Sequence, residues 1–161
     1  MNYMKTEKEQ LEEFVINNFI NNYQIELRIL KHSDKPDFTL FDKINNKKIG
    51  AEVTHLYYDG NEAKILLGRS DNKNSHGIMN FSNLINKLNE LINQKCDKIK
   101  EFKHHDKFIL IIRVASPIFD KFDFDRYEKD IIYPENKYSE IWIILDDNSK
   151  KQRWTELKQV K

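Results

Sequence analysis

Several residue types are scarce in this chain, and each shortage excludes a class of protein. There is one cysteine, Cys96, among 161 residues, which excludes an internal disulfide and a cysteine zinc cluster. The four glycines form no phosphate-binding loop. No apolar run approaches the roughly 20 residues of a membrane helix, and residues 1–10 lack the apolar core of a signal peptide. We therefore expect no membrane partner and a cytoplasmic location.

The chain also lacks an excess of charge of either sign. Lys and Arg number 27 and Asp and Glu number 26, which gives a net charge of +1. A surface that binds nucleic acid would therefore have to be a local basic patch. A charged fraction of 33% and an aromatic fraction of 12% are typical of a folded chain. The length predicts one domain over residues 1–161.

The first third of the chain predicts one helix followed by three strands. Thr6 and Glu9 have the spacing of a capping box, and apolar residues 11, 14, 15 and 19 follow helical spacing, so we expect a helix over 6–23. Alternating segments predict strands over 25–30, 37–41 and 48–58. A hairpin turn at 45–47 joins the last two strands.

The rest of the chain predicts a loop, a long helix and further strands. We expect a loop over 59–77 with a short helix at 62–67, then a helix over 78–102. Apolar runs predict buried strands at 108–114 and 141–145, with a short helix at 122–130 and an edge strand at 153–157. The order α-β-β-β-α-β-(α)-β predicts an α/β fold, in which helices flank a mixed central β-sheet.

Two acidic residues stand out against this pattern. Asp37 begins the second predicted strand, and Glu52 lies in the third, between Ala51 and Val53. A carboxylate among apolar residues loses hydration unless a cation or a hydrogen-bond donor meets it. Two carboxylates on adjacent strands could share a divalent metal ion, as in many enzymes that hydrolyse phosphodiesters.

A lysine in the long predicted helix could meet these acids. On a helical wheel Lys95 lies about 30° from the centre of the apolar stripe, between Leu88, Ile92 and Ile99. A lysine on the side of a helix that faces a sheet must either extend to solvent or meet an anion. Asp37 and Glu52 are candidate anions.

The pattern of these residues resembles the PD-(D/E)xK nuclease superfamily. The likeness covers the layout of about residues 6–115, with Pro36-Asp37 on the second strand and Glu52 on the third. The usual motif has a lysine two residues after the second acid, where this chain has Thr54. In the cap-snatching endonucleases of segmented RNA viruses the lysine lies on the following helix, in a segment similar to residues 94–100 here.

The resemblance implies a restriction-endonuclease-like αβββαβ core and a set of site residues. Asp37 and Glu52 would bind Mg²⁺ or Mn²⁺, with the Val53 backbone carbonyl as a further ligand. Lys95 would position the nucleophile or stabilise the scissile phosphate. Thr54 could hydrogen-bond an outer water, and His55 is a second peripheral candidate. A first-helix glutamate sometimes completes the metal site; the candidates are Glu7, Glu9, Glu12 and Glu13, of which we favour Glu12.

Each of these residues also has an ordinary structural interpretation. Pro-Asp is a common turn pair, and Glu52 on a half-exposed strand could face water. Lys95 could extend past the end of its helix, and a lone histidine such as His55 is more often a packing or surface residue. The three residues Asp37, Glu52 and Lys95, occurring in this order on these elements, favour the metal site.

The predicted function is therefore metal-dependent endonucleolytic hydrolysis of DNA or RNA. The alternative is a degenerate member of the fold that binds nucleic acid or a protein without cleaving it; Thr54 and the near-neutral charge support it. A third possibility is an interaction protein in which the acids are incidental. Phosphates could contact Lys43, Lys47, Lys48, Lys64, Arg69 and Lys73, and bases could stack on Tyr57, Tyr58 and Trp154. The edge strand near Trp154 could pair in a homodimer.

Overall fold

The computed structural model describes residues 4–57, 81–102, 105–114, 121–132, 138–147, 154–159 and 161. Its elements, in chain order, are α1 (Glu7–Asn22), β1 (Leu27–His32), β2 (Phe38–Asp42), β3 (Lys47–Leu56), α3 (Phe81–Lys98), the 3₁₀ turn η1 (Ile99–Glu101), β4 (Lys107–Val114), α4 (Lys121–Arg126), the 3₁₀ turn η2 (Glu128–Asp130), β5 (Glu140–Asp147) and β6 (Trp154–Gln159).

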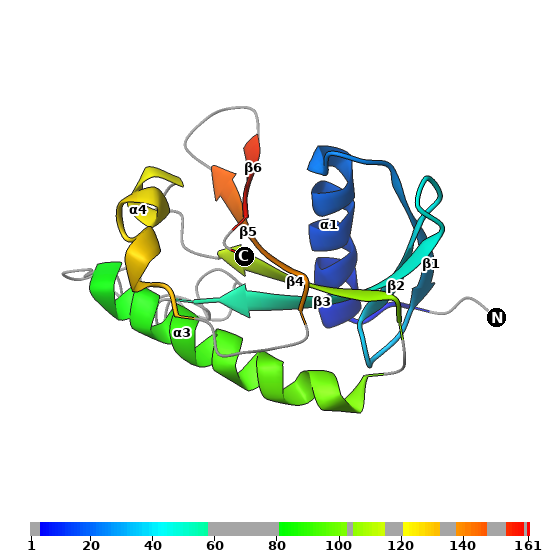
Figure 1. Cartoon of the computed structure of the whole chain (residues 1–161), viewed down its shortest axis with the longest axis horizontal. Coiled ribbons are helices and arrows are strands. Elements are labelled where there is room, and N and C mark those ends of the chain that lie inside the picture. Colours follow the sequence, from blue (N-terminus) through cyan, green and yellow to red (C-terminus); the bar gives the residue numbers. More distant parts are fainter. Residues whose placement is uncertain are drawn as a thin grey trace.

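The strands form one six-stranded mixed sheet in the order β1-β2-β3-β4-β5-β6 (Figure 1). The first three strands pair antiparallel, as a meander with tight connections. β3, β4 and β5 run parallel to one another, and β6 returns antiparallel at the edge. Parallel neighbours need a crossover connection, and α3 lies in the one between β3 and β4.

One face of the sheet is covered by α1. The helix begins with a complete capping box, in which the Thr6 side chain accepts from the Glu9 backbone N–H and the Glu9 side chain accepts from the Thr6 backbone. Its buried residues Val15, Ile16 and Phe19 pack on the odd-numbered positions of β3 and β4, such as Ile49 and Ile111, and on Phe38 and Leu40 of β2. Burial of such side chains contributes about 1.5–3 kcal/mol each.

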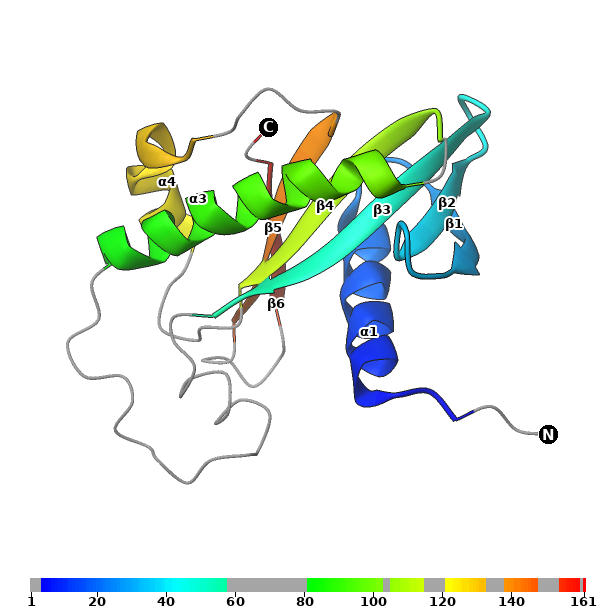
Figure 2. The same cartoon turned by 90° about the horizontal axis from the view of Figure 1, so that it is seen from below.

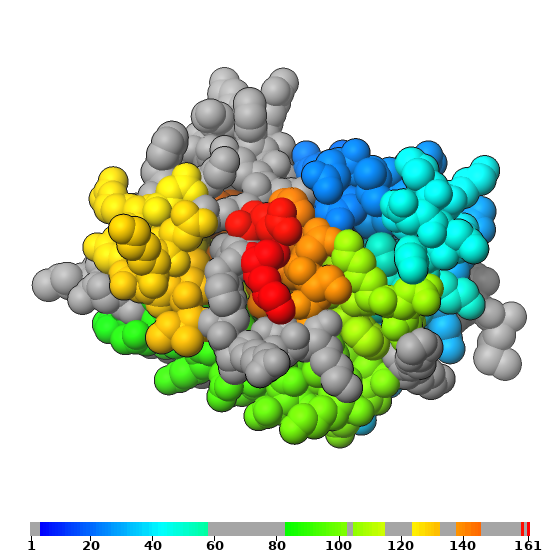
Figure 3. Space-filling model, viewed as in Figure 1, coloured from blue at the N-terminus to red at the C-terminus, as the bar shows by residue number. Residues whose placement is uncertain are grey.

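The opposite face of the sheet is covered by α3, with α4 beside it (Figure 2). Leu84, Leu88 and Ile92 are fully buried on α3 and pack on the even-numbered positions of β4 and on β5. Cys96 belongs to the same cluster as a buried free thiol. In the space-filling view α4 and the β1–β2 hairpin lie at opposite ends of the molecule (Figure 3).

The structure confirms the predicted α/β fold, a mixed central sheet flanked by helices. The edges of elements differ by up to four residues from the predicted ones, most at the end of α3, where the 3₁₀ turn η1 follows Lys98. The predicted helix over 122–130 is broken at Tyr127 into α4 and η2. The predicted loop over 59–77, its short helix, and Tyr58, Lys64, Arg69 and Lys73 lie outside the described residues.

Two further sequence predictions concern the edge of the sheet and the membrane. The predicted edge strand is β6, which pairs only with β5 in the described sheet. The side chain of Trp154, proposed to stack or to pair in a dimer, is not among the described ones. Among the described helices, none has the length and apolar character to cross a bilayer.

The absence of a side chain at Gly50 lets the Phe108 ring and Pro36 pack closely against the backbone of β3. A Cβ built on Gly50 would lie 2.7 Å from the Phe108 ring and 3.0 Å from Pro36. Pro36 precedes Asp37, and the Phe108 ring packs against Phe102 and His105. Any side chain at position 50 would therefore push away the Phe108 ring or Pro36, the residue before Asp37.

We predict that Gly50→Ala lowers the free energy of unfolding by about 1–3 kcal/mol, because the added methyl forces the Phe108 ring or Pro36 to shift. Urea denaturation measures the loss. Lys48→Ala, an exposed change two residues earlier on the same face of β3, is the control and should change stability by less than about 0.5 kcal/mol. Equal effects of the two substitutions would contradict the assigned contact.

Candidate functional site

Asp37 and Glu52 face each other on the side of the sheet that α3 covers. The β2–β3 register pairs Phe38 with Ala51, so Asp37 lies opposite Glu52. The Asp37 backbone N–H donates to Glu52 Oε1 at 3.4 Å, and the Val53 N–H donates to Asp37 Oδ2 at 2.9 Å. The β2–β3 ladder ends at Phe38 and Ala51, so the Val53 N–H has no backbone partner on β2. The Asp37 carboxylate accepts this hydrogen bond instead. Both acids are buried, with 7% and 5% of their surface exposed.

This environment favours a proton on the acid pair. Burial, the hydrogen bond to Glu52 and the charge of Glu52 together raise the pKa of Asp37 to about 9, against the opposing effect of the Val53 N–H. Two carboxylates this close cannot both ionise cheaply without a cation. The raised pKa therefore favours a proton on Asp37 at neutral pH.

Lys95 is the cation that reaches this pair from α3. Its Nζ lies 3.4 Å from Glu52 Oε2, and the side chain is 15% exposed. The Tyr138 hydroxyl, which is buried, donates to the Lys95 backbone carbonyl at 3.2 Å. That bond ties the last turns of α3 to the residues before β5. The structure thus brings together the three residues that the sequence singled out.

The acid pair opens into a pocket of about 330 Å³. Lys95 and the Val53 backbone line its floor with the acids, and Phe102 forms part of the wall. Exposed charged side chains surround its mouth, namely Lys8, Asp34, Lys35, Lys98 and Glu101, and the buried Glu12 also lines it. Lys35 and Glu101 lie 3.6 Å apart across the mouth, where both are exposed and their attraction is weak.

Glu12 is the one first-helix candidate that is buried, with 4% of its surface exposed. It lines the same pocket, and its charge contributes to the raised pKa of Asp37. Its Oε2 is 2.7 Å from His32 Nε2, and Lys8 lies 3.8 Å from its other oxygen. The His32 ring stacks on Phe38 with ring centroids 4.2 Å apart, so β1 and β2 hold Glu12 beside the acid pair.

The two peripheral candidates lie on opposite faces of β3. The unbroken β3–β4 register puts Thr54 on the same face as Glu52, where it is buried. His55 is on the α1 face, next to Arg113 of β4, and it does not line the pocket. Burial, with the nearby charges of Arg113, Lys95 and Lys8, lowers the pKa of His55 to about 4, and its Nδ1 is buried without a partner among the described residues.

Within the described residues no three acidic, histidine or cysteine side chains form a metal cluster. The candidate site therefore offers two carboxylates and backbone oxygen, a hard-oxygen donor set that suits Mg²⁺ or Mn²⁺. Mg²⁺ usually keeps several waters and binds through one or two carboxylates, so a third acidic side chain is not required.

Sequence reasoning missed His32 and the charged mouth of the pocket. His32 follows an alternating strand and has no motif around it. Lys8, Lys35 and Lys98 belong to three elements that are distant in the sequence. Only the packing of α1 and α3 against the ends of β2 and β3 brings these side chains together.

None of the protein-family models, curated proteins or solved structures compared with this chain matches it significantly.

The raised pKa of Asp37 predicts how stability depends on pH. Between the unfolded value near 4 and the folded value of about 9, the folded state holds a proton that the unfolded state has released. In EDTA the free energy of unfolding should therefore fall as pH rises through this range, by at most about 1.4 kcal/mol per pH unit. Asp37→Asn should remove that dependence.

Urea denaturation between about pH 7 and about pH 9 measures this dependence. His55 does not contribute in that range, because its lowered pKa affects stability only below the usual histidine pKa. For His55 the sign is opposite: its stabilisation is lost as pH falls from about 6.5 to about 4. Asp34→Asn, an exposed acid three residues before Asp37, is the control and should keep the wild-type slope. A wild-type slope in Asp37→Asn would show that another group titrates.

Proposed function

We propose that this protein hydrolyses phosphodiester bonds of nucleic acid with the help of a divalent metal ion. The observation that supports the proposal most is the buried pair of carboxyl groups, Asp37 and Glu52, with the Lys95 ammonium 3.4 Å from Glu52 at the floor of one pocket. The resemblance of the Asp37, Glu52 and helix-borne Lys95 pattern to nucleases with a migrated lysine points to the same reaction.

The residues present fit Mg²⁺ or Mn²⁺. The raised pKa of Asp37 marks a place where positive charge is favoured, and a divalent cation could take the place of the proton. In an extended strand the N–H and C=O of one residue point to the same side, so the Val53 carbonyl is on the side where its N–H meets Asp37. Asp37, Glu52 and this carbonyl would hold the ion.

Such an ion, when bound, lowers the pKa of a water and neutralises charge on the reacting phosphate. The residues of the chain supply the rest. Lys95 offers its ammonium group to a non-bridging phosphate oxygen or orients the attacking water. Glu12, held by His32, can accept a hydrogen bond from a water in the same pocket. The buried floor excludes bulk solvent, which strengthens each of these interactions.

The charged mouth of the pocket supports a phosphate-bearing polymer as substrate. Lys8 of α1, Lys98 of α3 and Lys35 of the β1–β2 connection line the same pocket as the acid pair. They could contact phosphates on either side of the bond that is cleaved, which a small phosphate ester would not need.

A second candidate function is binding without cleavage. It is favoured by Thr54 in the usual position of the lysine and by the two-acid site within the described residues. In that case Lys95 and the proton on Asp37 would serve only to neutralise buried charge. Metal binding and cleavage separate the two candidates.

We predict that metal binding releases about one proton at neutral pH, because Asp37 must lose its proton before it can act as a ligand. Calorimetric titration with Mn²⁺ in buffers of different ionisation enthalpy gives the number of protons directly. Asp37→Asn should abolish both the binding and the release. Tight binding without proton release would place the ion away from the acid pair.

We predict that Lys95→Met lowers the rate of Mn²⁺-dependent cleavage of mixed DNA and RNA by about 10²–10³-fold, because the phosphate loses its electrostatic partner. Its metal affinity should persist, whereas Glu52→Gln should lose both affinity and cleavage. Lys100→Met, an exposed lysine at the end of the same helical segment, is the matched control and should cleave like the wild type. Full activity of Lys95→Met would remove this lysine from the mechanism.

A further inference from the structure

The sheet face that carries the acid pair continues onto strands that α3 leaves uncovered. The apolar cluster beneath α3 contains residues of β3, β4 and β5 but none of β1 or β2. Seen from below, α3 crosses the parallel strands, and the β1–β2 hairpin extends beyond it (Figure 2). The other face of the hairpin packs on α1 through Leu27, Phe38 and Leu40.

The strand register arranges the uncovered side chains in rows. The row nearest the turn contains Arg28, Phe41 and Lys48, which are paired across β1, β2 and β3. The next row contains Lys31, the half-buried Thr39, whose hydroxyl is 2.9 Å from His105 Nε2, and Gly50, against which the Phe108 ring packs. The row after that contains Asp37 and Glu52, so the rows, about 7 Å apart, lead from the hairpin to the candidate site.

Cations outnumber acids on this face, where Glu26 lies beside Arg28 and Lys43 in one hollow. Arg28, Lys31, Lys43 and Lys48 are exposed, and within the described part of the chain none of them has an ion-pair partner. By contrast, Lys8, Lys35 and Lys95 at the pocket each have an acidic partner. Unpaired cations in a row are free to bind phosphates and release counterions.

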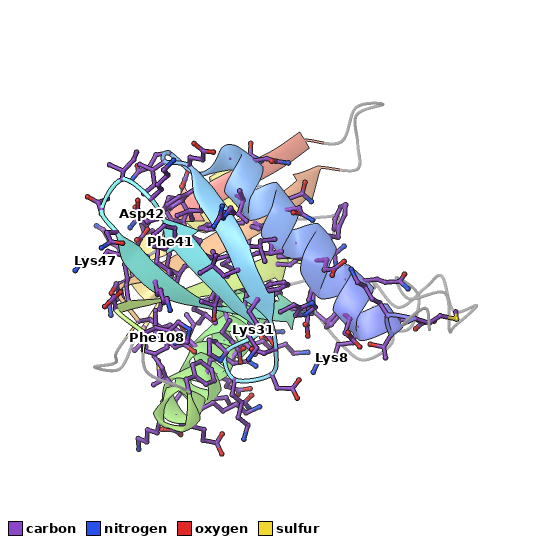
Figure 4. All side chains as sticks on the ribbon, turned by 90° about the vertical axis from the view of Figure 1, so that its right-hand side faces the viewer. Lys8, Lys31, Phe41, Asp42, Lys47 and Phe108 are labelled. Carbon is purple, nitrogen blue, oxygen red and sulfur yellow. The ribbon has the colours of Figure 1, made fainter. Side chains whose placement is uncertain are left out.

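An aromatic ring lies among these cations. Phe41 is half-buried and lines a hollow of about 260 Å³ together with Glu26, Arg28 and Lys43. In Figure 4 Phe41 lies near the hairpin turn, and Lys31 and Phe108 lie closer to α3. An aromatic side chain on an open sheet, with cations beside it, is the arrangement on which unpaired bases stack.

We propose that the track formed by Arg28, Lys31, Phe41, Lys43 and Lys48 binds a single strand of nucleic acid and leads it to the acid pair. Phe41 stacks on an unpaired base, and the cations contact the phosphates on either side. A duplex would keep its bases out of reach of Phe41, so the substrate class is single-stranded. This inference rests on the proposed function for its direction, but strand binding can be tested without the metal.

Fluorescence anisotropy in EDTA tests the track, with a labelled single strand of about 12 nucleotides as DNA or RNA and the matching duplex. The single strand should bind more tightly than the duplex. Arg28→Gln/Lys31→Gln should weaken single-strand binding about tenfold or more and reduce the slope of log affinity against log salt by about 1.4. Phe41→Leu, which keeps an apolar side chain but removes the ring, should weaken it about tenfold.

Lys100→Gln/Lys129→Gln removes the same charge from two exposed lysines outside the track and should bind like the wild type. An equal loss in this control would mean that net charge alone is measured, and would overturn the track. The track would also be overturned if polyglutamate displaced the labelled strand as well as an unlabelled single strand does. Tighter binding of the duplex than of the single strand would overturn it too.

The outcomes separate the track from the proposed function. Strand binding that the track variants weaken, without any cleavage in Mn²⁺, would support the track and reject the nuclease. Cleavage with strand affinity unchanged in the track variants would reject the track and leave the nuclease. No strand binding by the wild type at low salt would reject the track, whatever the cleavage assay shows.

Discussion

Asp37 and Glu52 lie opposite each other and are joined by a hydrogen bond, and the rest of the site depends on this contact. Two buried carboxyl groups in contact are unfavourable unless positive charge or hydrogen-bond donors accompany them. The structure supplies the Val53 N–H and the Lys95 ammonium, and the raised pKa of Asp37 favours a proton on that carboxyl group. Each comes from a different part of the fold, so the β2–β3 register, the start of β2 and the position of α3 must all agree.

The two faces of the sheet have different roles. The face beneath α1 carries one apolar cluster from β1 to β5, which holds the meander to the parallel strands. The other face is apolar only under α3, where it packs on β3, β4 and β5. Where α3 no longer covers it, the same face becomes polar, first at Asp37 and Glu52 and then along the β1–β2 hairpin. The site therefore lies at the boundary between a packed core and an open sheet.

The near-neutral charge of the chain hides this local arrangement. Cations and acids alternate around the pocket, so that Lys8, Lys35 and Lys95 are each neutralised by a neighbour. The hairpin face lacks such compensation in the described residues. A net charge of +1 is thus compatible with a basic surface, because opposite charges are segregated to different places.

Local patterns in the sequence determined the elements and three of the site residues. The capping box and apolar spacing of α1, the alternation of the meander and the apolar runs of β4 and β5 each follow from short-range periodicity. Glu52 and Lys95 could be singled out because each is a charge at a position where its own element predicts burial, and Asp37 because it follows Pro36 at the start of the neighbouring strand. Element edges moved by up to four residues, since capping and ladder pairing, rather than composition, end a helix or a strand.

Tertiary structure alone decided which side chains share the pocket. The pairing of Glu12 with His32, the lysines at the pocket mouth and the assignment of His55 to the other face depend on register and helix placement, which involve residues far apart in the chain. The raised pKa of Asp37 is also a tertiary property, because it arises from burial against a carboxyl group 15 residues away. The periodicity of apolar residues predicts which side of a helix or strand is buried. Only the packing of the whole chain determines which residues that side contacts.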